Sequence, residues 1–181
     1  MAASLTTESL SWTKADKVSK QLLDSKKKRE RDLGLAIALG IRTGLRKGDL
    51  LSLRITNLKN NRITGKASKT KKDYSHPIPE WLVEQISSNQ YLGNIYSTTY
   101  SHIWLNRSIQ RVFPIEYARA LKVGKTLGAH SLRKAFGLKL YEAYGVNAAR
   151  QGLQHSDSAT TARYLEIPAM EQEQKQAELF T

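Results

Sequence analysis

The stretch DLGLAIALGIRTGLRKGDLLSLR, residues 32–54, decides the fold that this sequence predicts. Its first part is apolar on most sides of a helix, which indicates a helix from about Asp32 to Arg42 at the centre of the protein. Gly44 then predicts a turn, and the leucines after it predict a short second helix that runs through Leu53. The chain is therefore expected to be built around one buried helix.

The sequence before this stretch predicts one more helix and a linker. In SWTKADKVSKQLLDS, residues 11–25, apolar side chains recur on one helical face, with Thr13 as the expected N-cap and Asp16 three residues on. The mixed-sign run KKKRERD, residues 26–32, is expected to be a solvated connection to the central helix.

The sequence after it contains the only strong strand signals. RITGKASKT and DYSHPIP flank a basic turn and predict an antiparallel hairpin, with Lys59–Asn61 turning into its first strand. Further helices are expected in PEWLVEQISS after Pro79, in YSHIWLNRSIQRVF, in SLRKAFGLKLYEAYG up to Gly145, in SATTARYLEI and in MEQEQKQAELF. The predicted fold class is mainly α with a small antiparallel sheet (α+β), in a single domain over residues 1–181.

The bulk properties exclude several classes of protein. A chain of 181 residues fits one domain, and the absence of cysteine excludes disulfides and thiolate metal sites. No apolar run approaches the roughly 18 residues that a membrane span needs, and the start MAASLTTESLSW does not read as a secretory signal. We therefore expect a cytoplasmic protein of a prokaryote or virus, with no membrane association.

The charge points to a polyanionic partner. Lys and Arg total 29 against 16 Asp and Glu, which gives a net charge of +13 and a pI near 10.0. The basic residues extend from Lys14 to Arg163 instead of gathering in one tail. Nucleic acid is the first candidate, and a solvated basic protein or a surface for anionic lipid are the alternatives.

Six side chains of the right types for phosphodiester chemistry are spread along the chain: Arg46, Lys69, His130, Arg133, His155 and Tyr164. Two arginines can grip the non-bridging oxygens of a phosphate bidentately. A histidine can donate a hydrogen bond to them or accept the nucleophile's proton, and a lysine can protonate the leaving oxygen. Nearby cations are expected to favour the phenolate of the tyrosine. This set needs no metal and no other cofactor, because guanidinium groups can stabilise the developing charge.

The segments that carry these residues resemble the tyrosine recombinases (the phage integrase family), relatives of type IB topoisomerases, over about residues 5–167. TGLRKGDLLSLR resembles the first arginine box, with Arg46 and the supporting acid Asp49. SKT resembles the catalytic lysine segment, with Lys69, and HSLR resembles the His-x-x-Arg box, with His130 and Arg133. GLQHSDSATTARYLEI resembles the final segment, with His155 and the nucleophile Tyr164.

The resemblance implies the catalytic fold of the DNA breaking-rejoining enzymes and a site-specific recombinase acting on double-stranded DNA. Tyr164 would form a 3′-phosphotyrosyl link, and four protomers would assemble on two DNA sites, with a monomer allowed when free. Residues 168–181 would form a C-terminal helix, anchored by Leu179 and Phe180, that docks on a neighbour or on its own domain. Lysines expected to contact DNA are Lys66, Lys71, Lys72 and Lys134. A type IB topoisomerase and a non-catalytic DNA-binding protein of the same fold are the alternatives.

Four features depart from the family pattern or leave it open. Gln154 stands where the family usually has glycine before the last histidine, and Lys134 where a histidine commonly follows the second arginine. Most relatives also carry an N-terminal helical domain that clamps the far side of the DNA, and none is expected here. Lys66, in TGK, is an alternative to Lys69 as the general acid, and regular strand alternation would put the two on opposite faces.

Overall fold

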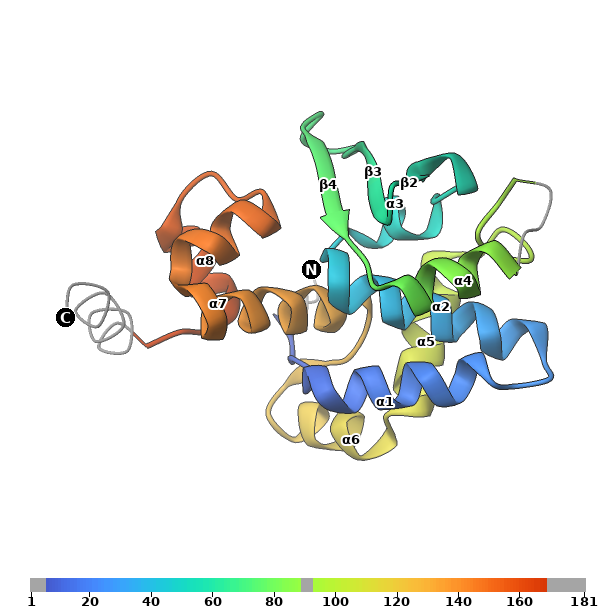
Figure 1. Cartoon of the computed structure of the whole chain (residues 1–181). Coiled ribbons are helices and arrows are strands. Elements are labelled where there is room, and N and C mark those ends of the chain that lie inside the picture. Colours follow the sequence, from blue (N-terminus) through green and yellow to red (C-terminus); the bar gives the residue numbers. More distant parts are fainter. Residues whose placement is uncertain (1–5, 89–92, 169–181) are drawn as a thin grey trace.

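The computed structural model describes residues 6–88 and 93–168, and within them the chain is mostly helical (Figure 1). The helices are α1 (Trp12–Leu23), α2 (Lys28–Thr43), α3 (Lys47–Leu51), α4 (Glu80–Ser88), α5 (His102–Val112), α6 (Pro114–Lys122), α7 (Ala129–Leu153) and α8 (Ser158–Leu165). The 3-10 turn η1 (Ile55–Asn57) leads into an antiparallel sheet of β2 (Leu58–Lys59), β3 (Arg62–Lys66) and β4 (Asp73–Pro77), in that order. The predicted fold class is confirmed.

The helix α2 lies at the centre, as predicted, and every residue of Leu33 to Ile41 is buried. It packs against α1, α3, α7 and β4, so that α1 and the hairpin lie on different sides of it (Figure 1). Its start was predicted wrongly, because the charged run 26–32 contributes its first turn instead of a linker. The carboxylate of Asp32 is buried in that turn and accepts hydrogen bonds from Ser97 N (3.1 Å) and Tyr100 Oη (2.7 Å).

The turn after α2 depends on Gly44. Its φ of 58° is in the left-handed region, and a Cβ added there would lie 2.2 Å from the ring of Phe136 on α7. Two constraints therefore require glycine at this position: the left-handed backbone conformation and the close approach of α7. The turn brings Arg46 to the N-cap position of α3.

The hairpin is confirmed, with register Ile63 to His76 and Lys66 to Asp73. Asn60 and Asn61 both adopt positive φ, as a two-residue type I′ turn between β2 and β3 requires. The sequence did not reveal α6, the short strand β2, or the parallel pair of β1 (Thr6–Thr7) with β5 (Lys125–Thr126). A two-residue strand pair has too short a pattern to be recognised.

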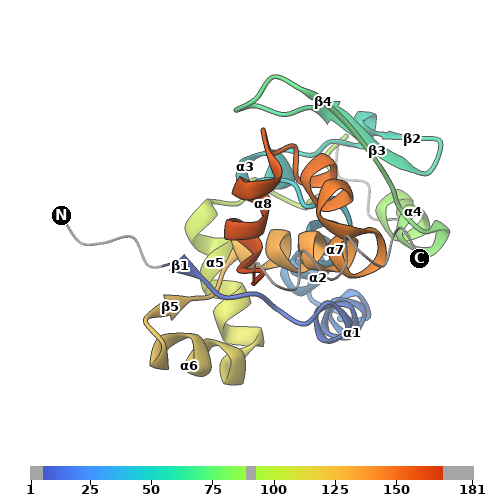
Figure 2. The ribbon, with the colours of Figure 1, turned by 90° about the vertical axis from the view of Figure 1, so that its left-hand side faces the viewer.

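The helix α7 bends at Gly145, which has φ 78° and ψ −178°. The predicted helix therefore does end there, and residues 146–153 continue as a further helical segment. This segment and α8 enclose a small core separate from the main one, formed by Phe136, Tyr141, Ala149, Leu153, Ala162, Leu165 and Ile167. In Figure 2 α8 lies in front of α7.

One predicted cap was wrong, and one predicted helix cannot be assessed. Ser11, not Thr13, caps α1 by accepting a hydrogen bond from Lys14 N. Asp157 caps α8 by accepting from Thr160 N (2.6 Å). The helix predicted in MEQEQKQAELF lies outside the described residues.

Replacing Gly44 with alanine should lower the free energy of unfolding by about 1–3 kcal/mol, because it adds a clash with Phe136 to the strain of positive φ. Gly124→Ala is the matched control, since Gly124 has φ 67° but open space around its Cβ position. Urea unfolding of both variants measures the difference. An equal loss in both would mean that the close approach of α7 contributes nothing.

Candidate functional site

Arg133 is the centre of the site. It projects from the first turns of α7, is 6% exposed, and donates hydrogen bonds to two backbone carbonyls, those of Gly44 and Leu153. These bonds join the end of α2 to the end of α7. A guanidinium has five N–H donors, so further donors remain for an anion.

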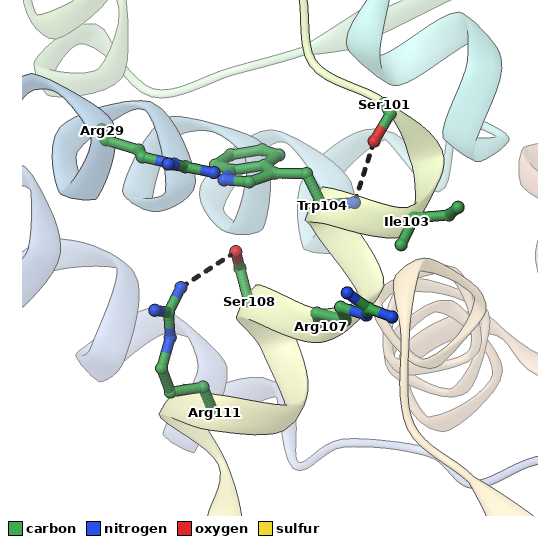
Figure 3. A pocket seen from close by; sticks show the side chains of 7 residues that line it. All are labelled: Arg29, Ser101, Ile103, Trp104, Arg107, Ser108 and Arg111. Carbon is green, nitrogen blue, oxygen red and sulfur yellow. Dashed lines mark hydrogen bonds between the residues drawn. The ribbon is translucent and has the colours of Figure 1, made fainter.

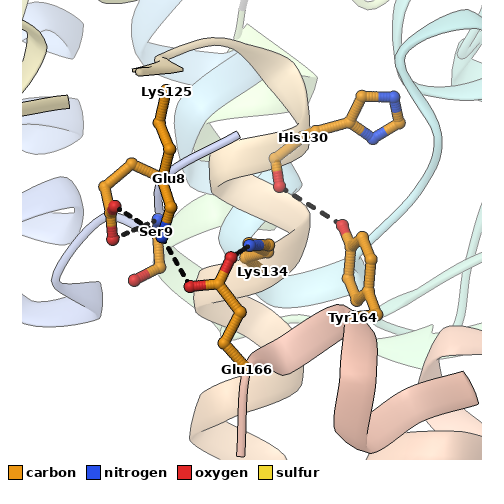
Figure 4. Close-up of polar contacts among 7 residues, drawn as sticks. All are labelled: Glu8, Ser9, Lys125, His130, Lys134, Tyr164 and Glu166. Atoms are coloured by element: carbon orange, nitrogen blue, oxygen red, sulfur yellow. Dashed lines mark hydrogen bonds and ion pairs between the residues drawn. The ribbon is translucent and has the colours of Figure 1, made fainter. Parts of the chain in front are cut away.

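Tyr164 on α8 lies beside this guanidinium. Arg133 and Arg46 both act on its hydroxyl and lower the pKa of that group. The hydroxyl also lies 3.4 Å from the carbonyl oxygen of His130 (Figure 4). The ring of His155 meets the ring of Tyr164 edge-on, with centroids 5.2 Å apart. The side chains of Arg133, His155 and Tyr164 thus lie together, and Arg46 is close enough to act on them electrostatically. His130 meets Tyr164 through its backbone carbonyl, while its ring is turned away from Tyr164 (Figure 4).

The pKa of Tyr164 is set mainly by burial, which raises it to about 12. Arg133 and Arg46 act in the opposite direction and favour the phenolate, as expected, but they do not outweigh burial in the protein without DNA. The hydroxyl stays protonated at neutral pH and needs a base to become a nucleophile.

Both predicted histidines are available in the neutral form. Burial, followed by the charges of Arg133 and Arg46, lowers the pKa of His155 to about 4. Burial and the charges of Arg133, Lys47 and Arg46 also lower the pKa of His130. Arg133 itself stays cationic at neutral pH, although burial lowers its pKa to about 10.

One hydrogen bond fixes the proton on His155. Its Nδ1 lies 3.2 Å from Thr161 Oγ1, and that hydroxyl donates its only proton to the carbonyl of Asp157 (3.1 Å). The hydroxyl can therefore only accept from His155, so Nδ1 carries the hydrogen. Nε2 is left with a lone pair that can take up a proton.

Lys69 is the predicted catalytic residue that the structure does not bring into contact with this cluster. It is exposed in the turn 68–70 beyond the end of β3, so strand alternation, which was expected to distinguish it from Lys66, does not apply. The preceding residue is held in place, because Ser68 N donates to Asp49 Oδ1 (2.9 Å). Asp49, 6% exposed, thus links the turn to α3, as a supporting acid would.

The lysines predicted to contact DNA fall into two groups. Lys66, Lys71 and Lys72 are exposed on or beside the β3–β4 turn. Lys134 is 6% exposed, and its ammonium pairs with Glu166 (2.7 Å) and lies 5.8 Å from the centre of the Tyr164 ring. Its contact with DNA stays a prediction, and the structure gives it a role in holding α8.

Three residues that the sequence analysis missed adjoin the site: Lys47, Lys125 and Glu166. Glu166 follows α8 and pairs with Lys125 (2.6 Å) as well as Lys134, and Lys125 also pairs with Glu8 (3.2 Å) (Figure 4). Partners so far apart in sequence leave no local pattern. Lys47, next to Arg46 in the first arginine box, could have been noticed from its position.

Outside the cluster around Arg133, a basic hollow lies between the start of α2 and α5 (Figure 3). Arg29, Arg107 and Arg111 line it, with the Arg29 guanidinium 5.9 Å from the Trp104 ring centre and Arg111 Nη2 donating to Ser108 Oγ (3.3 Å). The Trp104 indole N–H has no partner there. The hollow has the chemistry of an anion site and was not predicted.

Two features are absent from residues 6–88 and 93–168. No group of three or more His, Cys, Asp or Glu side chains in these ranges could hold a metal ion. None of the helices described there is long and apolar enough to span a membrane.

Residues 12–170 match the model of the phage integrase family. The chain is 29% identical over 168 residues to the probable integrase/recombinase YoeC of Bacillus subtilis (strain 168), covering 87% of each chain. Its fold is similar to that of the XerH recombinase bound to difH, with a TM-score of 0.71, 17% identity and 98% of this chain covered. The fold is also similar to that of a lambda integrase dimer bound to a COC′ core site, with a TM-score of 0.65 and 18% identity. That match covers 90% of this chain and 60% of the lambda integrase chain. The chain spans about half of the XerH chain (55%).

Acidification should destabilise the protein between about pH 6.5 and pH 4. Burial lowers the pKa of His155 and of His76 to about 4, so over this range the unfolded chain binds more protons than the folded one. Stability is therefore retained above pH 6.5 and lost as the pH falls. Urea unfolding at pH 7 and pH 5 measures the loss.

His76→Gln should reduce that pH dependence, because it removes one of the buried titrating groups. His102→Gln, at an exposed position on α5, is the control and should leave the dependence unchanged. Identical pH profiles for the wild type and His76→Gln would contradict the assignment.

Proposed function

This chain belongs to the phage integrase family, and we propose that it cleaves and rejoins double-stranded DNA as a site-specific recombinase with Tyr164 as nucleophile. The observation that supports the proposal is the buried guanidinium of Arg133 with unused donors, beside the Tyr164 hydroxyl, two neutral histidines and Arg46. A preorganised cation next to a nucleophile is what attack on a phosphodiester requires.

In the proposed cleavage step, Arg46 and Arg133 bind the non-bridging oxygens of one phosphate. Tyr164 Oη forms a bond to phosphorus while the bond to the 5′-oxygen breaks, which leaves a 3′-phosphotyrosyl link. Lys69, on the exposed turn, supplies the proton to the leaving 5′-oxygen. A 5′-hydroxyl of a second strand then attacks the link, so the energy of the phosphodiester is conserved.

The tyrosine proton passes to a histidine in this scheme. An arriving phosphate partly neutralises the two arginines whose charges lower the pKa of His130 and His155. DNA binding would thus raise the basicity of these histidines at the moment when a base is needed. His155, with a lone pair on Nε2, can accept the proton without rearranging its bond to Thr161.

The DNA contacts would extend beyond the cleaved phosphate. The net charge of +13 favours a polyanion, and the exposed Lys66, Lys71 and Lys72 on the hairpin can reach neighbouring phosphates. Four protomers on two DNA sites would carry out exchange. Strand exchange between two duplexes distinguishes this recombinase from a type IB topoisomerase, which would only relax supercoils.

Tyr164→Phe should abolish covalent capture of nicked suicide DNA and leave non-covalent binding nearly unchanged, because only the hydroxyl is lost. SDS-resistant adducts and a filter-binding assay measure the two properties. Tyr144→Phe, on α7 with a 72% exposed ring, is the control and should form the adduct normally. If Tyr164→Phe still forms an adduct, Tyr164 is not the nucleophile. If the wild type forms no adduct, the proposed cleavage does not occur.

Arg46→Lys should slow cleavage by a factor of about 100 or more, roughly 3 kcal/mol of transition-state stabilisation, since it keeps the charge but loses the bidentate fork. Arg133→Lys should do the same and also lower stability, because it cannot reproduce both bonds to Gly44 and Leu153. Arg119→Lys, exposed on α6, is the control. Near-normal single-turnover rates for Arg46→Lys would contradict its role.

A further inference from the structure

Gln154 has an unusual backbone conformation for its residue type. It ends α7 with φ 53° and ψ 37°, in the left-handed region that favours glycine. A non-glycine residue is strained there and persists where the surroundings hold it. The conformation explains why glycine would suit this position, and raises the question of what the glutamine side chain contributes.

The side-chain amide of Gln154 bridges to the hairpin. Its Nε2 donates to the carbonyl of Asp73 (3.0 Å), and its Oε1 accepts from Thr70 Oγ1 (3.3 Å). Thr70 is the last residue of the turn 68–70 that carries Lys69, and Asp73 is the first residue of β4. The amide thus uses both its donor and its acceptor on the segment that follows Lys69.

The other side of the turn is held by Asp49, which accepts from Ser68 N (2.9 Å). The turn carrying Lys69 is therefore fixed on one side to α3, close in sequence to Arg46, and on the other to the end of α7. Gln154 also lies between Leu153, whose carbonyl binds Arg133, and His155. The two attachments relate the position of Lys69 to both arginines and to His155.

We propose that Gln154 is a positioning residue, whose side-chain amide holds the β3–β4 turn against the end of α7 and so sets Lys69 in line with the leaving oxygen. This proposal rests on the proposed recombinase function. Glycine would relax the backbone but release the turn. Asparagine tolerates the left-handed conformation, yet its amide is one methylene too short to reach the same partners.

The two hydrogen bonds from the Gln154 amide to Thr70 and Asp73, called the clamp below, can be tested in the free protein by hydrogen exchange. In Gln154→Gly the amides of the turn, including Ser68 N–H and Lys71 N–H, should exchange about tenfold faster or more, while amides of α2 keep their rates. Thr70→Val, which removes one of the two bonds, should give a smaller increase. Unchanged exchange in Gln154→Gly would overturn the clamp.

The consequence for catalysis can be tested with two suicide substrates. Gln154→Gly and Gln154→Asn should cleave an ordinary phosphodiester about tenfold more slowly or worse, as should Lys69→Ala. All three should cleave a 5′-bridging phosphorothioate at nearly the wild-type rate, because sulfur leaves without a general acid. Gln151→Ala, at an exposed glutamine of α7, is the control and should cleave both substrates normally.

The outcomes separate the proposal from its premise. If the Gln154 variants cleave both substrates equally slowly, the substitution has a structural effect on the whole site. If their turn amides exchange faster but cleavage is normal, the clamp does not position Lys69. Either result overturns the positioning role. If the wild type cleaves neither substrate, the proposed function fails, whereas hydrogen exchange still decides whether the clamp exists. Rescue by sulfur together with faster exchange supports the proposal.

Discussion

The hydrogen bonds from Arg133 to the carbonyls of Gly44 and Leu153 are the interaction on which the rest of the site depends. A guanidinium taken out of water is costly unless its donors are satisfied, and these two carbonyls supply part of that satisfaction. The same bonds fix the end of α2 against the end of α7, which is why Gly44 must have no side chain facing Phe136. The remaining N–H donors of the Arg133 guanidinium are held in a fixed position, so little reorganisation is needed when a phosphate arrives.

Burial also sets the protonation of the groups around Arg133. It keeps Tyr164 protonated, with a pKa of about 12, and keeps His155 neutral, with a pKa of about 4. A neutral tyrosine beside a neutral histidine is unreactive until charge enters the site. In the proposed reaction the phosphate brings that charge, so the arrangement would restrict formation of the nucleophile to the DNA-bound state.

The nucleophile and the general acid of the proposed reaction are each held from outside the main core. Tyr164 belongs to α8, which packs on the small core of α7 and is joined to distant segments by Glu166 through Lys134 and Lys125. Lys69 belongs to a turn held by Asp49 and Gln154. The turn of Lys69 is held by a few polar contacts, whereas α8 also packs on an apolar core and Arg133 is fixed by packing and by its bonds to the backbone.

The sequence by itself determined the elements with long, regular patterns: the buried run of α2, the turn at Gly44, the hairpin and the helices α1, α4, α5 and α7. It also pointed, through the family resemblance, to Arg133 and to the four residues near it, Arg46, His130, His155 and Tyr164. It did not reveal the first turn of α2, the β1–β5 pair, the ion pairs of Glu166, the contacts of Gln154 or the direction of the Tyr164 pKa. Periodicity and turn chemistry act between neighbours in the chain and can be read locally. Burial and contacts between distant segments exist only after the helices have packed, so only the tertiary structure decided them.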